Sequence, residues 1–168
     1  PERLAVAWNS FSRVIAFARP KIGDIMLEID GIAHTPITPF DGDVAKTQVP
    51  SANLQRLPFI VRPQADTLIF GSGGGEHILT ALDCGARHVT GIEYNPIIVD
   101  MVDRRFADVS GGLFQRPDVE IVVSEGRSFI RRTPRKFDVI QFTLIDTWAA
   151  TAAGAFTLTE NNVYTVEA

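Results

Sequence analysis

Residues 66–76 read Asp-Thr-Leu-Ile-Phe-Gly-Ser-Gly-Gly-Gly-Glu, and this stretch decides the fold. Its run Thr67–Phe70 is short and apolar, as expected of a parallel strand that is buried on both faces. The spacing of apolar residues from Glu76 to Leu82 predicts a helix, and Gly85 suits the C-terminal cap of that helix. A strand, a glycine-rich loop and a helix in this order predict the first unit of an open α/β sheet.

The glycine loop, Gly71 to Gly75, indicates a ligand site. In open α/β sheets, ligands bind beyond the carboxyl ends of the strands, near the point where the strand order reverses. Glycines are needed there because the backbone must approach the ligand closely and adopt positive φ. The alternative is an ordinary tight turn, and the position of the loop between a strand and a helix favours the ligand site.

Strands and helices alternate through the rest of the chain. Such alternation predicts right-handed βαβ units and a doubly wound sheet. The expected strands are His88–Ile92, Val119–Val123 and Phe137–Phe142, and the expected helices are Ile97–Phe106 and Arg127–Arg132. Pro96 stands where a first-turn proline opens a helix.

Residues 1–63 differ in texture and read as short extended pieces separated by turns. The β-like runs are Val14–Ala18 and Ile25–Ile29, and Asp30-Gly31 predicts a tight hairpin turn after the second. Residues 52–60 are expected to form a short helix that Pro58 breaks or kinks. We therefore predict a β-rich N-terminal segment over residues 1–63 and a Rossmann-like nucleoside-binding domain over residues 64–168.

Composition narrows the classes of function. The chain has 168 residues, a net charge of −4 and one cysteine, so no disulfide framework or cysteine-based zinc site is expected. His34 and His88 have no ligand spacing to Cys84, and no metal is predicted. The charge balance argues against a nucleic-acid partner. The sequence has no apolar run long enough to span a bilayer and no signal-peptide pattern, so we expect a soluble, cytoplasmic domain. We also expect this domain to be excised from a longer protein.

Two acidic residues follow the next strands. Glu93 lies 22 positions beyond Gly71, where a carboxylate can accept hydrogen bonds from both ribose hydroxyls. The alternative is a surface glutamate at a strand end. Glu125 follows the third strand and can accept from the exocyclic amine of adenine; an N-cap at the next helix explains it equally well.

The spacing of the glycines separates two kinds of nucleoside. A dinucleotide fingerprint places its third glycine three positions after the second, and here that position is Glu76. Gly71, Gly73 and Gly75 form a G-x-G-x-G pattern instead. A sulfonium nucleoside carries no phosphates and suits this loop better, so the pattern favours an S-adenosyl ligand.

These blocks resemble the spermidine and spermine synthases, a family within the class I methyltransferase fold. The resembling blocks are the hairpin Leu27–Gly31, Leu57–Ile60, the glycine loop, Glu93 before Asn95-Pro96, Glu125–Phe129, Phe137–Ile140, Asp146, and Leu158–Glu160 with Tyr164. The likeness is greatest to divergent polyamine-synthase-like domains that form the soluble part of multi-span membrane proteins, so the parent protein is expected to carry a membrane domain.

The resemblance implies aminopropyl transfer from decarboxylated S-adenosylmethionine to a diamine. The chain departs from the family in three places. Gly74 stands where the family has an aspartate that grips the aminopropyl nitrogen, and Thr143 stands where it has the catalytic aspartate. Residues 51–53 replace a Tyr-His-Glu of the amine site, whereas Asp146 matches a second family aspartate. The acceptor is therefore not expected to be a standard diamine.

We expect a transferase that uses S-adenosylmethionine or its decarboxylated form. Asp146 is the candidate for orienting the acceptor or accepting its proton, with Thr143 and Tyr164 lining the pocket. The alternatives are a non-catalytic nucleoside-binding domain and a small-molecule methyltransferase. The chain holds fewer strands than a complete methyltransferase sheet, so a C-terminally short sheet and a homodimer are expected. His77 is expected to face solvent.

Overall fold

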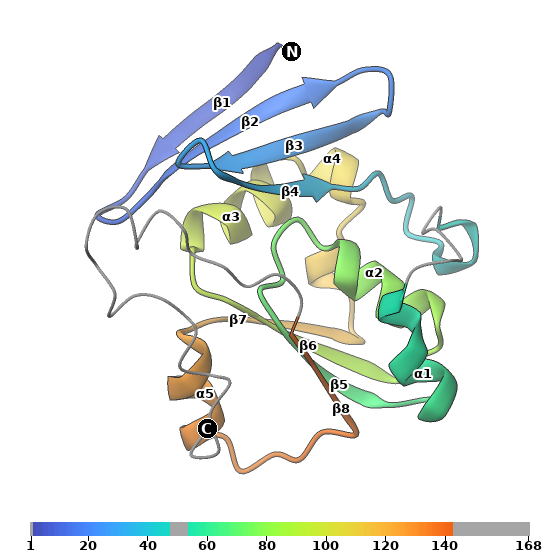
Figure 1. The fold of residues 1–168 in the computed structure, drawn as a ribbon. Helices are drawn as coiled ribbons and strands as arrows, with labels where there is room; N and C mark the ends of the chain where they lie inside the picture. The colour runs from blue at the N-terminus through green and yellow to red at the C-terminus, as the bar shows by residue number, and fades with distance from the viewer. Residues whose placement is uncertain (1, 48–53, 143–168) are drawn as a thin grey trace.

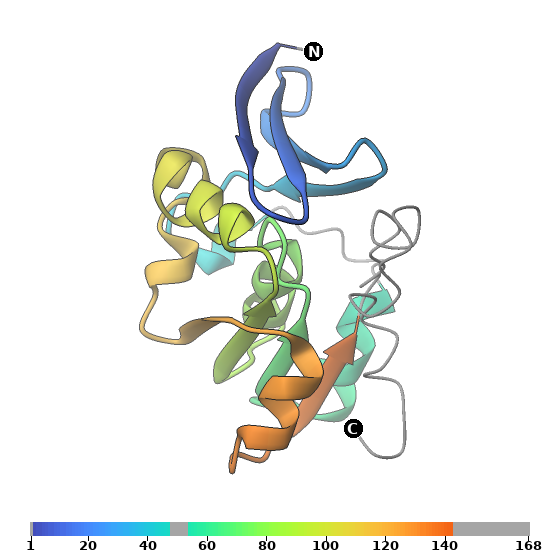
Figure 2. The same ribbon diagram turned by 90° about the vertical axis from the view of Figure 1, so that its left-hand side faces the viewer.

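A computed structural model describes residues 2–47 and 54–142 of the chain. An antiparallel N-terminal sheet forms one layer and lies over an α/β unit built on a parallel sheet (Figures 1 and 2). This arrangement confirms the predicted α/β class with a β-rich N-terminal segment. The predicted pocket residues Thr143, Asp146 and Tyr164 lie outside the described residues.

The N-terminal sheet has four strands in sequential order, each antiparallel to the next. The strands are β1 (Arg3–Trp8), β2 (Arg13–Arg19), β3 (Asp24–Ile29) and β4 (Ala33–Ile37). The sequence did not predict β1, because its run Leu4–Trp8 is continuously apolar and lacks the alternation of a half-buried strand, although Ala5 is buried and Leu4, Val6 and Trp8 are exposed. Trp8 is 70% exposed and lies on the surface of the sheet rather than in the core.

The predicted hairpin turn at Asp30-Gly31 is confirmed. Both residues have positive φ, 55° for Asp30 and 76° for Gly31, a conformation that aspartate and glycine tolerate best. The Asp30 carboxylate accepts a hydrogen bond from the backbone N–H of Arg13 at 2.8 Å. This bond ties the turn between β3 and β4 to the start of β2.

The parallel sheet has the strand order β7-β6-β5-β8. Its strands are β5 (Asp66–Phe70), β6 (His88–Glu93), β7 (Val119–Val123) and β8 (Val139–Phe142). The chain adds β6 and β7 on one side of β5 and then returns to place β8 on the other side. The strand order therefore reverses beside β5, where the glycine loop begins.

Apolar residues cover both faces of this sheet, as the buried strands predict. On one face, Ile69 of β5 belongs to a core cluster with Ile78 and Ile98 from two of the helices. On the other face, Leu68 and Phe70 pack with a second set of apolar residues. Alternate residues of one strand thus point to opposite sides, and each side is closed by its own helices.

The helices follow the predicted order with local differences. They are α1 (Leu57–Val61), α2 (Glu76–Asp83), α3 (Pro96–Asp100), α4 (Ala107–Ser110) and α5 (Gly126–Arg132), with short turns η1 (Val44–Lys46), η2 (Leu54–Arg56) and η4 (Leu113–Gln115). The helix predicted from Ile97 widens into a π-helical turn, η3 (Met101–Arg105). Pro58 opens α1 rather than breaking a helix, because a proline in the first turn loses no intrahelical bond.

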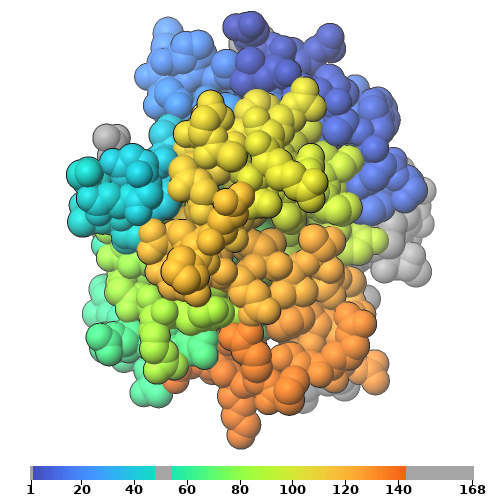
Figure 3. Space-filling view, turned by 180° about the vertical axis from the view of Figure 1, so that it is seen from behind, coloured from blue at the N-terminus to red at the C-terminus, as the bar shows by residue number. Residues whose placement is uncertain are grey.

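The N-terminal sheet and the α/β unit share one core. Leu27 of β3 and Ile37 of β4 belong to the same buried cluster as Leu79 and Met101. Seen from behind, the yellow segment from α3 to α4 lies directly beneath the blue strands (Figure 3). In the part of the chain that the structure describes, no helix has the length and apolar content needed to cross a membrane.

The shared core gives a test of how the two layers depend on each other. Leu27 is fully buried beneath the N-terminal sheet, whereas Leu54 is 78% exposed. We expect Leu27→Ala to lower the free energy of unfolding by about 2–5 kcal/mol, through lost burial and the cavity left behind. The matched Leu54→Ala variant is expected to change it by about 0.5 kcal/mol or less. Urea unfolding measures both, and equal losses would contradict the shared core.

Candidate nucleoside site

The predicted site residues meet at the carboxyl edge of the parallel sheet. Phe70 of β5 is in register with Ile92 of β6, and Glu93 is in register with Val123 of β7. The glycine loop, Glu93 and Glu125 therefore follow three neighbouring strands at one edge. The parallel topology produces this juxtaposition, as expected for a ligand site in a doubly wound sheet.

The glycine loop has the backbone conformation that its sequence predicts. Gly71, Gly73 and Gly75 have φ of 70°, 49° and 96°, which side chains rarely adopt. Gly71 and Gly73 are half-buried, so their backbone is accessible to a ligand. Gly75 is buried, and a Cβ added to it would lie 2.6 Å from Cδ2 of Leu113.

Glu93 is buried and bonded to the loop. Its Oε2 accepts a hydrogen bond from the N–H of Gly73, and its Oε1 accepts one from the N–H of Asn95, both at 2.9 Å. Burial raises the pKa of this carboxyl, although hydrogen bonds from the backbone oppose the shift. Each oxygen of a carboxylate can accept a second hydrogen bond, so the two ribose hydroxyls of a nucleoside can still be bound.

Asn95 joins Glu93 to the N-terminal sheet, a link that sequence reasoning missed. The Asn95 side chain donates to Oγ of Ser12 at 2.8 Å and accepts from Nδ2 of Asn9 at 2.9 Å. Its Oδ1 also accepts from the N–H of Ile97 and caps α3. The Asn-Pro pair signals such a cap, but no local pattern shows that a turn more than 80 residues earlier in the chain supplies the partners.

Thr35 of β4 is a second missed residue. Its hydroxyl accepts a hydrogen bond from the N–H of Gly74 at 2.8 Å, and Ile37 forms an antiparallel bridge with Gly75. In Figure 1 the green loop that precedes α2 rises to meet β4. Strand β4 thus forms a wall against the glycine loop, a contact between residues 39 positions apart that no sequence spacing predicts.

Glu125 fits the N-cap alternative. Its two carboxylate oxygens accept hydrogen bonds from the N–H of Arg127 at 2.7 Å and of Ser128 at 2.8 Å, which caps α5. Partial burial alone would raise the pKa of Glu125, but these hydrogen bonds outweigh it and lower the pKa. Its contact with adenine remains a prediction.

Aromatic and imidazole side chains flank the site. Phe11 packs against Tyr94, which follows Glu93, with the ring centroids 4.8 Å apart. His77 is half-buried, so the expectation that it faces solvent was wrong; its Nδ1 lies 2.6 Å from Oε1 of Gln55. Burial lowers the pKa of His77 and favours the neutral imidazole.

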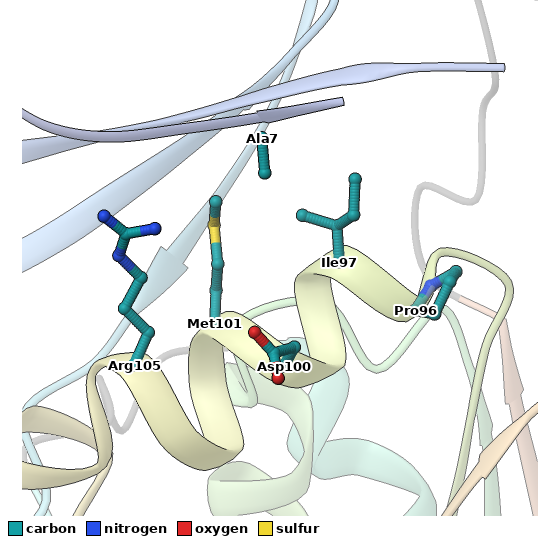
Figure 4. A pocket seen from close by; sticks show the side chains of 6 residues that line it. All are labelled: Ala7, Pro96, Ile97, Asp100, Met101 and Arg105. Carbon is teal, nitrogen blue, oxygen red and sulfur yellow. The ribbon is translucent and has the colours of Figure 1, made fainter. Parts of the chain in front are cut away.

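A cleft of about 250 Å³ lies beside the start of α3. Its lining residues are Ala7, Pro96, Ile97, Asp100, Met101 and Arg105 (Figure 4). The cleft runs between β1 and α3, and none of its lining residues belongs to the loop or is Glu93 or Glu125. Within residues 2–47 and 54–142, no cluster of potential metal ligands is present.

Curated relatives and solved structures resemble this chain, although no protein-family model matches it. A polyamine aminopropyltransferase of Thermoplasma acidophilum is 29% identical over 79 residues, covering 47% of this chain and 29% of the relative. One from Pseudomonas syringae pv. tomato is 26% identical over 129 residues, covering 76% of this chain and 42% of the relative. The chain thus spans less than half the length of these relatives.

Two spermidine synthase structures share the fold. The enzyme of Thermotoga maritima superimposes with a TM-score of 0.60 at 21% identity, covering 88% of this chain and 49% of that one. A spermidine synthase in complex with the transition-state analogue AdoDATO gives a TM-score of 0.56 at 19% identity. The predicted resemblance in sequence and in fold is confirmed.

The buried carboxyl of Glu93 predicts a distinct pH dependence. Its pKa is raised above the ordinary 4.5, so the folded chain keeps this proton to higher pH than the unfolded chain. The contribution of Glu93 to stability is therefore complete below pH 4.5 and decreases as pH rises through the folded pKa. Relative to a Glu93→Gln variant, the free energy of unfolding of the wild type should decrease as the pH rises from 4.5 through the folded pKa of Glu93.

Urea unfolding across a pH series measures this difference. Glu2, which is exposed, supplies the matched control, and Glu2→Gln is expected to leave the profile of the wild type unchanged. The difference in free energy of unfolding between the wild type and Glu93→Gln is the quantity to follow. If it is constant with pH, the folded chain does not retain the proton of the Glu93 carboxyl to higher pH.

Proposed function

Because the chain belongs to a spermidine synthase-like family with a class I methyltransferase-like fold, we propose that it binds an S-adenosyl nucleoside as a transferase donor. The donor is S-adenosylmethionine or its decarboxylated form, and the acceptor is a small amine other than a standard diamine. The observation that carries the proposal is the hydrogen bond between the N–H of Gly73 and Oε2 of Glu93 at 2.9 Å. It brings the loop and the ribose-binding acid together at one sheet edge.

We call the proposed nucleoside site between the glycine loop, Gly71 to Gly75, and Glu93 the crevice. Each part of it has a proposed role toward the nucleoside. Glu93 accepts hydrogen bonds from the ribose hydroxyls, the accessible backbone of Gly71 and Gly73 contacts the 5′ side, and Glu125 lies at the adenine end. The relatives named polyamine aminopropyltransferase and the synthase bound to AdoDATO support a donor of this class. The absence of a carboxylate at Gly74 supports an acceptor and a donor tail that differ from those of a standard polyamine synthase.

The transfer itself is an in-line displacement. The acceptor nitrogen forms a bond to the carbon beside the sulfonium, the carbon–sulfur bond breaks, and the neutral thioether leaves. The new ammonium then loses a proton. The protein contributes alignment of the two reactants and a group that takes this proton, and Asp146 is the residue proposed for the second role.

Isothermal titration calorimetry tests nucleoside binding. We expect the wild type to bind S-adenosylmethionine or its decarboxylated form, and Glu93→Gln to bind the same nucleoside about 10-fold or more weakly, because hydrogen bonds to a charged acceptor are lost. Absence of heat with both donors and with methylthioadenosine would overturn the proposal.

Glu125→Ser is the companion variant. Serine retains the N-cap of α5, so α5 keeps its stability. A loss of affinity in this variant then reports a contact with the nucleoside, whereas unchanged affinity assigns Glu125 to capping alone. Glu2→Gln, at an exposed position outside the proposed nucleoside contacts, is expected to bind like the wild type.

Turnover separates an enzyme from the non-catalytic alternative. We expect transfer from the donor to an amine acceptor, and a rate at least about 100-fold lower in Asp146→Asn, the range that a general base contributes. Mass spectrometry of the released thioether measures this rate. Donor binding with no turnover by the wild type would favour a nucleoside-binding domain without catalysis.

A further inference from the structure

The wall formed by β4 bears on which nucleoside the crevice accepts. When the ribose is bound at the acid after the second strand, its 5′ substituent lies at the glycine loop. The question is therefore what lies beyond the loop on that side. In this chain it is the backbone of β4 at Thr35, Pro36 and Ile37.

Two contacts hold β4 against the loop. Thr35 Oγ1 accepts from the N–H of Gly74, and Ile37 bridges Gly75. A Cβ built on Gly74 would lie 1.9 Å from the carbonyl oxygen of Pro36. Gly74 does not have positive φ, so a side chain is excluded there by space alone. No side chain from position 74 can reach a ligand while β4 holds this place.

A Cβ on the neighbouring Gly73 meets the same wall, because it would lie 2.5 Å from Thr35 Oγ1. The N–H groups of Gly73 and Gly74 are also engaged, since that of Gly73 binds Glu93 and that of Gly74 binds Thr35. The 5′ end of the crevice therefore presents backbone and a threonine, and no ionised side chain from the loop.

The carboxylates on β3 and at the start of α2 already have basic side chains beside them. Glu28 of β3 lies 3.6 Å from Nε2 of His34, and Asp24 accepts a hydrogen bond from Nε of Arg19 at 2.6 Å. The hydrogen bond with Asp24 raises the pKa of Arg19, and the charge of Glu76 raises it to a smaller extent. Glu76 therefore also interacts electrostatically with this guanidinium. These three carboxylates therefore each already have a basic side chain nearby.

We infer that the crevice prefers adenosine with a compact, uncharged 5′ thioether over a nucleoside with an ammonium-bearing tail, and that Thr35 determines this preference by fixing β4 on the loop. This inference rests on the proposed nucleoside site and narrows its ligand class.

Calorimetry with three probes tests the preference. We expect methylthioadenosine to bind the full chain at least as tightly as decarboxylated S-adenosylmethionine, with S-adenosylmethionine no tighter than either. Binding of the decarboxylated donor 10-fold or more tightly than methylthioadenosine would overturn the inference and leave the proposed function standing. Binding of none of the three would overturn both.

Variants at Thr35 test the determinant. Thr35→Val keeps the shape and removes the acceptor for the N–H of Gly74, whereas Thr35→Ser keeps the acceptor. We expect Thr35→Val to bring the dissociation constants of methylthioadenosine and the decarboxylated donor together, changing their ratio at least 3-fold, and Thr35→Ser to keep the wild-type ratio. Because the readout is the ratio of two dissociation constants, a general loss of folded protein does not change it. An unchanged ratio in Thr35→Val would show that Thr35 does not determine the preference.

A ligand-free measurement tests the wall itself. A Cβ on Gly42 meets no atom within 4 Å, so Gly42→Ala, at φ +91°, measures the cost of backbone strain alone. Gly74→Ala has no such strain, and we expect it nevertheless to lower the thermal midpoint more than Gly42→Ala does. A midpoint for Gly74→Ala equal to or above that of Gly42→Ala would show that β4 does not press on the loop in solution.

Discussion

The buried carboxylate of Glu93 is the interaction on which the site depends. Its oxygens bind the N–H groups of Gly73 and Asn95, and therefore join the loop after β5 to the turn after β6. Taking a carboxylate out of water is costly, and backbone N–H groups offset that cost only if both turns are held in place. The rest of the molecule can be understood as the means by which these two turns are held.

The N-terminal sheet supplies that support at two points. The turn between β1 and β2 holds Asn95 through Asn9 and Ser12, and β4 holds the loop through Thr35. Because both contacts come from one sheet that shares its core with the α/β unit, the sheet acts as a brace over the carboxyl edge of the parallel sheet. Strand β4 of this brace also leaves no space for a side chain at Gly74, so the sheet that supports Glu93 also shapes the glycine loop.

The sequence could predict what local chemistry determines. The buried strand Thr67–Phe70, the glycines with positive φ, the Asp30-Gly31 turn and the opening of α3 at Pro96 are all encoded within a few neighbouring residues. The brace depends on pairings across long separations, and no residue type in β1 or β4 signals them. Glu125 could be interpreted in two ways, because a cap and an adenine contact need the same side chain at the same place.

The position of β8 relates the glycine loop to the residues that follow β8 in the sequence. β8 is parallel to β5, with Phe142 in register with Phe70, and the two rings stack with centroids 4.5 Å apart. Strand β8 therefore ends at the level where the glycine loop begins, on the side of β5 opposite Glu93. The chain thus leaves β8 at the same sheet edge as the glycine loop and Glu93, which is the edge where ligands bind in doubly wound sheets, and Asp146 follows shortly afterwards in the sequence.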